Sequence, residues 1–209
     1  MKAKKMQFYF APNTIAAASA FALNEAGLDY QAIKIDFANG EQTKSEYLKL
    51  NPKARVPALV TDQGIITETG AILEYVAALA PDRGLMPSDP YAAAKVREML
   101  HYCASTMHVN HAHKFRGSRW ADQDASLADM TAKVPQTMTA SCAYVEPLIQ
   151  GSFLFGEQIT IADCHLYTIC RWLEGDGVDL AAFPKIEEYM AAMSARASVQ
   201  KALNDRIIG

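Results

Sequence analysis

Histidines gather in one stretch of this 209-residue chain, at a spacing that suits chemistry. His101, His108, His111 and His113 fall where a helix is expected, and His108 and His111 are three residues apart, which places them on one helical face. An imidazole titrates near neutral pH, so His108 can act as an acid or a base, or serve as a hydrogen-bonded histidine between domains. A metal site needs a third ligand in suitable geometry, and we expect none.

An acidic residue and a hydroxyl residue, Glu68 and Thr69, stand where another helix is expected to begin. Glu68 can pair with an ammonium group, and the Thr69 hydroxyl with the N–H groups of the first helical turn can bind a carboxylate. The same residues also suit an ordinary helix N-terminus, with Thr67 or Thr69 as the cap and Glu68 favoured by the helix dipole. These residues alone leave both interpretations open.

Composition and charge exclude several classes of protein. Apolar residues make up 50% of the chain, charged residues 21%, and the formal net charge is −3, so we expect no general affinity for nucleic acid or for an acidic membrane. The chain shows neither a signal peptide nor an apolar run of membrane-spanning length, which predicts a cytoplasmic protein. Its four cysteines form no CxxC pair and are expected to be buried, reduced thiols: Cys103, Cys142, Cys164 and Cys170.

The helices and strands that must position these groups can be predicted from the periodicity of apolar residues and from the glycine and proline residues that interrupt it. The first 80 or so residues alternate between strand and helix patterns, in the order β-α-β-α-β-β-α. The first βαβ unit implies parallel strands, and a hairpin around Asp62-Gln63-Gly64 adds an antiparallel edge. We predict strands at 6–10, 29–36, 58–61 and 65–67, and helices at 16–27, 45–50 and 68–80.

The rest of the chain is predicted to be helical. A segment rich in proline, residues 81–90, indicates a domain boundary. Helices are predicted at 91–115, at 125–150 with interruption or bending by Pro135 and Pro147, at 160–175, and at 183–203 as one or two helices. We therefore expect a domain over residues 1–80, a linker over 81–88 and an all-helical domain over 89–209.

Three short motifs give this layout a likeness to a known family. NPKARVPAL, Asn51 to Leu59, is similar to NP-x-G-x-VPAL, with Ala54 where glycine is commonest, and Glu68-Thr69 is similar to an acidic-or-Gln plus Ser/Thr pair. TIAD, Thr160 to Asp163, is similar to the N-capping box S/T-x-x-D. Together with the C-terminal stretch, these motifs resemble the cytosolic glutathione S-transferases from Met6 to Leu203, most of all the bacterial beta-like members.

The resemblance implies a fold and a glutathione site. The implied fold class is α/β plus all-α, an N-terminal thioredoxin-like domain and a C-terminal helical-bundle domain. In the family the Val-Pro bond is cis, and here Val56, before Pro57, would pair through its N–H and C=O with the cysteinyl backbone of glutathione. Glu68 would meet the ammonium and Thr69 the carboxylate of the γ-glutamyl end. Lys53 and Arg55, or Lys34, would meet the glycyl carboxylate.

One departure from the family pattern concerns the thiol. Members activate it with Tyr, Ser or Cys, and the beta-like pattern is P-G-A-C-S, whereas this chain has Pro12-Asn13-Thr14-Ile15-Ala16. Ile15 and Ala16 fall where the cysteine and serine belong and cannot stabilise a thiolate. We expect Thr14 first and Asn13 second to do so. Tyr9 is a third candidate if its ring does not face the core.

The helical part is expected to hold the second substrate. His108 matches by spacing a histidine that lines the cleft near the sulfur in beta-like members. Tyr9, His111, Arg116 and Trp120 would line the pocket, although the basic, aromatic end of the long helix also suits a solvated helix end.

The implied activity is conjugation of the glutathione thiol to a small hydrophobic electrophile, a detoxifying transferase reaction. We expect a homodimer with glutathione as co-substrate and without metal, nucleic-acid or membrane partners. Two alternatives remain: a glutathione-dependent disulfide reductase or isomerase, and a non-catalytic protein that binds glutathione or another ligand.

Overall fold

The computed structural model describes residues 5–209, which form two compact units. The first unit comprises the residues up to Ser88 together with Ala195–Gly209, and the second comprises Asp89–Ser194. The second unit begins at Asp89, where the helical domain was expected to begin, but residues 81–88 and 195–209 belong to the first unit. Each unit is described by itself.

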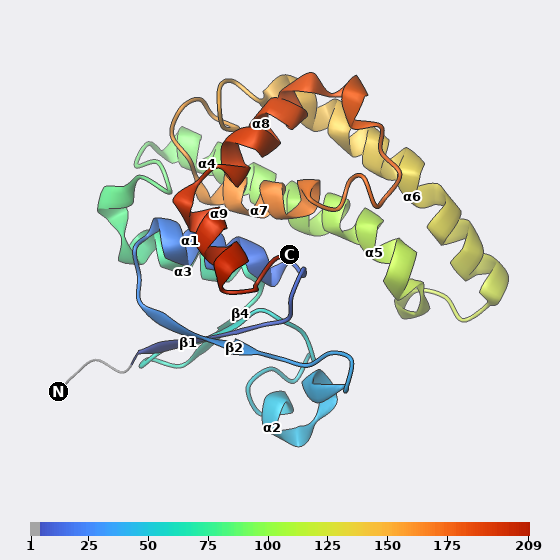
Figure 1. The fold of residues 1–209 in the computed structure, drawn as a ribbon, viewed down its shortest axis with the longest axis horizontal. Coiled ribbons are helices and arrows are strands. Elements are labelled where there is room, and N and C mark those ends of the chain that lie inside the picture. Colours follow the sequence, from blue (N-terminus) through green and yellow to red (C-terminus); the bar gives the residue numbers. More distant parts are fainter. Residues whose placement is uncertain (1–4) are drawn as a thin grey trace. The chain divides into compact units, whose positions relative to one another are not determined.

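A four-stranded sheet forms the centre of the first unit (Figure 1). Its order is β2-β1-β3-β4, with β1 and β2 parallel and the other neighbours antiparallel, which confirms the predicted thioredoxin-like order. The strands are β1 (Met6–Phe10), β2 (Tyr30–Lys34), β3 (Ala58–Val60) and β4 (Ile65–Thr67).

Two helices, α1 (Ala16–Glu25) and α3 (Thr69–Leu79), cover one face of the sheet, and the short α2 (Ser45–Leu48) lies on the other side (Figure 1). Short 3₁₀ turns occur at Glu41–Thr43 and Pro81–Arg83. Helix α1 packs against β1, α3 and α9 (Ala197–Asn204), so its run of small residues is buried on every side. Alanine and serine at these positions let the neighbouring backbones approach closely.

The alternation of side chains along β1 decides the orientation of Tyr9. Phe8 and Phe10 are buried, with their rings stacked at 6.0 Å. Tyr9 therefore points to the opposite face of the sheet, where its ring centroid lies 6.0 Å from that of Tyr47 in α2.

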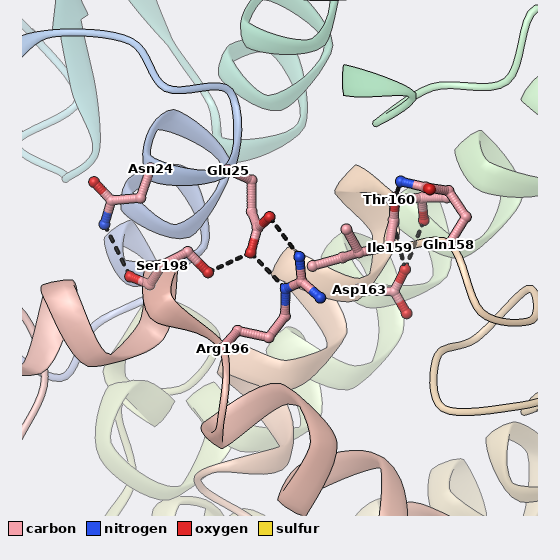
Figure 2. A network of polar contacts seen from close by, with 8 residues as sticks. All are labelled: Asn24, Glu25, Gln158, Ile159, Thr160, Asp163, Arg196 and Ser198. Carbon is pink, nitrogen blue, oxygen red and sulfur yellow. Dashed lines mark hydrogen bonds and ion pairs between the residues drawn. The ribbon is translucent and has the colours of Figure 1, made fainter. Parts of the chain in front are cut away.

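Polar contacts fasten the C-terminal helix to the first unit (Figure 2). The Glu25 carboxylate, at the end of α1, accepts from Arg196 Nε at 2.5 Å and Nη2 at 2.7 Å, and also from the Ser198 hydroxyl. Asn24 Nδ2 donates to the Ser198 carbonyl at 2.9 Å. Helix α9 is thus held against α1 by an ion pair and hydrogen bonds as well as by packing.

The second unit consists of helices joined by loops (Figure 1). Helix α7 (Ile161–Cys170) is wholly buried and packs on α4 (Pro90–Tyr102) and α8 (Pro184–Ser194). Helix α5 (His108–Arg116) packs on α6 (Asp124–Val145). Of the predicted interruption or bend, α6 shows no interruption at Pro135, and it ends at Val145, shortly before Pro147. A π-helical stretch, Cys103–Met107, joins α4 to α5, and 3₁₀ turns occur at Gly117–Arg119, Glu146–Leu148 and Leu180–Ala182.

The predicted capping box begins α7 (Figure 2). Asp163 Oδ2 accepts from the Thr160 N–H at 2.7 Å and from the Thr160 hydroxyl at 2.8 Å, and Asp163 Oδ1 accepts from the Leu154 N–H at 2.8 Å. Asp163 is fully buried, so it needs these donors to satisfy its oxygens. Its role is structural, as expected.

The four cysteines are free and buried, as predicted, and burial raises the pKa of the Cys142 thiol to about 12. Within residues 5–209, no helix combines the length and the apolar character that crossing a membrane would take.

Candidate functional site

Three chain segments lie together at one edge of the sheet. Tyr9 pairs with Ala58 in antiparallel register, so the residues that follow β1 run beside those that precede β3. Ala58 pairs in turn with Thr67, so Glu68 leaves β4 beside Pro57. This site edge consists of residues 11–15, 54–57 and 68–71. It brings the segment with Asn13 and Thr14 near most of the residues predicted to bind glutathione, although they are far apart in sequence. Lys34, the alternative partner of the glycyl carboxylate, lies elsewhere, at the end of β2.

Two buried donors fix the backbone of the segment before Pro57. The Tyr47 hydroxyl donates to the Arg55 carbonyl at 2.6 Å, and Asn51 Nδ2 donates to the same oxygen at 2.7 Å. The Arg55–Val56 peptide is planar and trans, so the Val56 N–H points opposite to the clamped carbonyl. Within residues 5–209 no group accepts from that N–H. It is therefore free for a ligand backbone.

Tyr47 stays a donor over the whole physiological range. Burial raises the pKa of its hydroxyl to about 12, although the hydrogen bond with Asn51 acts in the opposite direction. Asn51 is 1% exposed and also accepts from the Lys53 N–H at 3.2 Å. The Val56-Pro57 peptide bond is cis, as the resemblance implied.

Glu68 and Thr69 stand at the start of α3 as predicted. Glu68 has φ 74° and ψ 127°, a conformation that costs an ordinary L-residue on the order of 1–3 kcal/mol and is typical of ligand-binding turns. The helix begins at Thr69, so the N–H groups of Thr69, Gly70 and Ala71 have no partner within the helix. Glu68 thus presents a carboxylate beside a donor-rich helix end.

The cations before Pro57 lie in different places. Lys53 Nζ lies 2.5 Å from Glu68 Oε1 and 2.7 Å from Thr67 Oγ1, in an ion pair open to solvent. The Arg55 side chain is exposed. Lys53 is therefore placed beside Glu68, which was not expected from its position in the sequence.

The segment after β1 contains the predicted thiol-activating residues. The Thr14 hydroxyl donates its one proton to the Ala11 carbonyl at 2.7 Å. Asn13 is exposed and has φ 58°, a left-handed conformation that asparagine tolerates better than most residues. Ile15 and Ala16 are buried, at 7% and 0% exposure. The side chains that replace the family's cysteine and serine therefore face the core.

A pocket of about 630 Å³ lies beside Asn13 in the first unit. Val56, Glu68 and Thr69 do not line it, so it is a neighbour of the site edge rather than the same cavity. Its walls come from the end of β1, from β2 and from the C-terminus: Phe10, Pro12, Asn13, Ala32, Lys34, Leu203, Asp205, Arg206, Ile208 and Gly209.

In the second unit, two of the predicted histidines flank one indole. The His111 ring stacks on Trp172 at 4.2 Å and 19°, and the His108 ring centroid lies 5.5 Å from the same indole. His111 Nδ1 lies 2.7 Å and 3.0 Å from the two carboxylate oxygens of Asp176, which is 3% exposed. The carboxylate therefore orients the imidazole so that Nδ1 carries a proton.

The remaining predicted residues of the second unit lie beyond these histidines. Trp120 is 49% exposed, and its ring lies 4.7 Å from that of His113, whereas Arg116 ends α5 with an exposed side chain. Lys114 Nζ donates to the Gly175 carbonyl. In the part of the chain that the structure describes, no three His, Cys, Asp or Glu residues come together as metal ligands would.

Sequence reasoning missed the residues that hold the predicted ones in place. Tyr47 and Asn51 clamp the Arg55 carbonyl, and Asp176 orients His111 from 65 positions away. The one usable signal was Asn51, because a buried asparagine inside the Asn-Pro motif must use its amide group. Nothing in the local sequence indicated the Asp176 contact.

Comparison with known proteins covers both units. A family model described as "Glutathione S-transferase, N-terminal domain" matches residues 4–78, and one described as "Glutathione S-transferase, C-terminal domain" matches residues 110–206. Among curated proteins, the chain is 30% identical over 202 residues to "Glutathione S-transferase GstA" of Escherichia coli O157:H7, covering 95% of this chain and 98% of that protein.

Solved structures share the fold over almost the whole chain. A glutathione transferase homologue from Sulfitobacter, with bound glutathione, is 53% identical with a TM-score of 0.94, covering 97% of this chain and 99% of that one. A sphingomonad glutathione S-transferase complexed with glutathione is 27% identical with a TM-score of 0.84, covering 96% and 98%.

Proposed function

Since this chain belongs to the glutathione S-transferase family, we propose that it binds glutathione at the site edge and conjugates its thiol to a small hydrophobic electrophile. The observation that carries this proposal is the register of β1, β3 and β4, which brings the free Val56 N–H, Glu68 and the α3 N-terminus to one edge of the sheet. A protein kept only as a scaffold has no need of these groups at one place.

Each part of glutathione has a partner of matching chemistry. The Val56 N–H donates to the cysteinyl carbonyl of the ligand, and the Val56 carbonyl accepts from its N–H. Glu68 pairs with the ammonium of the γ-glutamyl end. The Thr69 hydroxyl and the N–H groups at the start of α3 bind the neighbouring carboxylate.

Two cations complete the ligand site. Because Lys53 lies beside Glu68, it meets the γ-glutamyl carboxylate rather than the glycyl carboxylate. Arg55, whose side chain is exposed, remains for the glycyl end. Pro57 gives the adjoining segment its cis conformation.

The thiol is activated at the segment after β1. The thiol proton leaves to solvent, and the thiolate is held by the Asn13 amide and by N–H groups at the start of α1, with the Thr14 hydroxyl as a further donor if it leaves Ala11. The sulfur then attacks the carbon that bears a leaving group: the carbon–sulfur bond forms, and the leaving group departs with its electron pair.

The second unit supplies the pocket for the electrophile. His108 and His111 around Trp172, with Arg116 and Trp120, form an aromatic and cationic wall. His108 is an acid or base for the leaving group. We further propose that the enzyme is a cytoplasmic homodimer that detoxifies electrophiles.

The first experiment measures glutathione binding by calorimetric titration of the wild type, Glu68→Gln and Asp62→Asn. Glu68→Gln should weaken binding about tenfold, because the ammonium loses its charged partner. Asp62→Asn makes the same change of charge at the β3–β4 turn, at the opposite end of the hairpin, and should leave the dissociation constant as in the wild type.

The second measurement is the pKa of the bound thiol, from thiolate absorbance during a pH titration. A thiol pKa well below that of free glutathione, with turnover of an aryl halide, supports the transferase. Binding with an unchanged thiol pKa would indicate a carrier, and turnover of disulfides alone would indicate a reductase. If glutathione does not bind, the proposal is wrong.

A further inference from the structure

The C-terminal segment, Arg206–Gly209, returns to the site edge and makes two hydrogen bonds to Asn13. The Asn13 N–H donates to the Ile207 carbonyl at 3.0 Å, and the Gly209 N–H donates to Asn13 Oδ1 at 3.0 Å, across 196 positions of sequence. Ile207 is 0% exposed and Ile208 is 6% exposed, so the segment is held in the first unit by its apolar side chains. Asn13 is therefore tied at both its backbone and its side chain.

The bond from Gly209 determines which way the Asn13 amide faces. A backbone N–H can only donate, so the side-chain atom opposite it must be the carbonyl oxygen Oδ1. The carboxamide is planar, which directs its NH₂ group away from the C-terminal segment. Within residues 5–209, no group accepts from Asn13 Nδ2, and the residue is exposed. Two polarised N–H bonds are therefore free for an acceptor.

Two other polar hydrogens of residues 11–15 are already engaged. The Thr14 hydroxyl donates to the Ala11 carbonyl, and the Asn13 backbone N–H donates to Ile207. Of the side-chain donors of residues 11–15, only the Asn13 amide is then available without rearrangement. A thiolate needs such a donor. The orientation of this donor, the Asn13 amide, is set by Gly209.

We propose that the Gly209 N–H and the Ile207 carbonyl are positioning groups that aim the Asn13 carboxamide at the glutathione sulfur. This inference rests on the proposed glutathione site. It makes the C-terminal segment part of the apparatus that stabilises the thiolate, although the segment itself does not touch the ligand. Without the segment, the amide rotates and the left-handed backbone at Asn13 loses a bond that holds it.

A matched pair of variants removes one hydrogen. Gly209→Pro abolishes the N–H that binds Asn13 Oδ1, whereas Gly209→Ala keeps it, and no atom lies within 4 Å of an added Cβ. Compared with Gly209→Ala, we expect Gly209→Pro to lower kcat/KM for conjugation about 3- to 10-fold, as the loss of one hydrogen bond would. The thiol pKa of bound glutathione should rise toward that of free glutathione.

A second pair of variants, Asn13→Asp with and without Gly209→Pro, separates the orientation of the Asn13 side chain from its ability to donate hydrogen bonds. Asn13→Asp keeps the oxygen that accepts from Gly209 but removes both amide donors, so the thiol pKa should rise although the C-terminal segment stays attached. In that background, Gly209→Pro should change the thiol pKa much less than it does alone. Thermal unfolding of all four proteins excludes loss of folding as the cause, and the Gly209 amide signal reports whether the segment is docked.

The outcomes distinguish this inference from the proposed function. If wild type binds glutathione with a lowered thiol pKa but the Pro and Ala variants have the same thiol pKa, the positioning role is overturned and the glutathione site stands. Equal effects of Gly209→Pro with and without Asn13→Asp also overturn it. If the wild type leaves the thiol pKa unchanged, the proposed activation is wrong, and the role of Gly209 fails with it.

Discussion

At the scale of single residues, a hydrogen-bond donor can serve a ligand only if its proton is not already given to another group of the protein. Sequence alone ranked Thr14 above Asn13, because a hydroxyl at a helix start is a natural thiol partner. In the folded chain the Thr14 proton is given to Ala11, and the Asn13 amide is turned outward. Our proposal therefore places Asn13 before Thr14 on the basis of two contacts, one local and one 196 positions away, of which only the local one lay within reach of sequence reasoning.

Ala54 provides a prediction at this scale. It has φ 54°, a left-handed conformation that costs an L-residue about 1 kcal/mol and that glycine adopts without this cost. Ala54→Gly should raise the free energy of unfolding by about 0.5–1 kcal/mol, part of the gain being offset by the entropy of the unfolded chain. Urea denaturation measures it.

The control for Ala54→Gly is the same substitution where φ is helical. Ala94 is exposed within α4, and replacing it by glycine should lower the free energy of unfolding by about 1 kcal/mol. A destabilised Ala54→Gly variant would show that the strain at this position is not relieved by removing Cβ.

At the scale of elements, most of the fold was predictable because periodicity and breakers are local. The strands at 6–10 and 65–67 and the capping box at Thr160 were predicted correctly. For the segment 125–150 the sequence left an interruption and a bend open, and the structure shows that α6 is not interrupted at Pro135. The docking of α9 on α1 was missed, because amphipathic spacing shows that a helix has a partner but not which one.

The contact between α1 and α9 supports a second prediction. Burial raises the pKa of Glu25, but hydrogen bonds from Arg196 and Ser198 outweigh it, so the pKa lies below the ordinary value of 4.5. The stabilisation is therefore complete above about pH 4.5 and is lost as the pH falls through the lowered pKa. Glu25→Gln should cost about 1–2 kcal/mol at neutral pH, and the two proteins should converge in acid.

Denaturation midpoints of wild type and Glu25→Gln across this pH range measure the effect. The control is Glu98→Gln, which breaks the exposed pair of Glu98 with Lys95 and should leave stability nearly unchanged. A constant difference between wild type and Glu25→Gln at every pH would contradict a role for the ionised carboxylate.

At the scale of the whole molecule, the family models and the solved structures confirm the family and the fold class predicted from the sequence. They were predictable because the motifs at Asn51–Leu59 and Thr160–Asp163 are specific. The register of the strands brings Val56, Pro57, Glu68 and Thr69, which we predict to bind glutathione, to one sheet edge. The groups that orient them could not be predicted, since Tyr47, Asp176 and Gly209 act through contacts that no periodicity encodes.

A third prediction concerns acid stability of the molecule. His165 is fully buried, and neither ring nitrogen has a hydrogen-bond partner among residues 5–209. Burial, with His108 nearby, lowers its pKa to about 3. The unfolded chain takes up a proton near the ordinary value of 6.5 whereas the folded protein does not. The free energy of unfolding should therefore fall as the pH drops below about 6.5, by up to about 1.4 kcal/mol per pH unit.

In His165→Leu the free energy of unfolding should fall less as the pH drops below about 6.5. It should also be higher at neutral pH, because the substitution removes two unpaired buried nitrogens. Urea denaturation between about pH 7 and pH 5 measures both effects. His101→Gln, at an exposed position, should keep the wild-type pH dependence. An unchanged slope in His165→Leu would show that His165 is not the group responsible.

The return of residues 195–209 to the first unit has a consequence for synthesis of the chain on the ribosome. Glu25 and Arg196 are separated by 171 positions, which at about 5–20 residues per second is a delay on the order of 10 to 30 seconds. The second unit is continuous in sequence and can close before the first is complete. During that interval the side of α1 that α9 later covers is bare, so nascent chains of this protein should be clients of chaperones that shield exposed apolar helices.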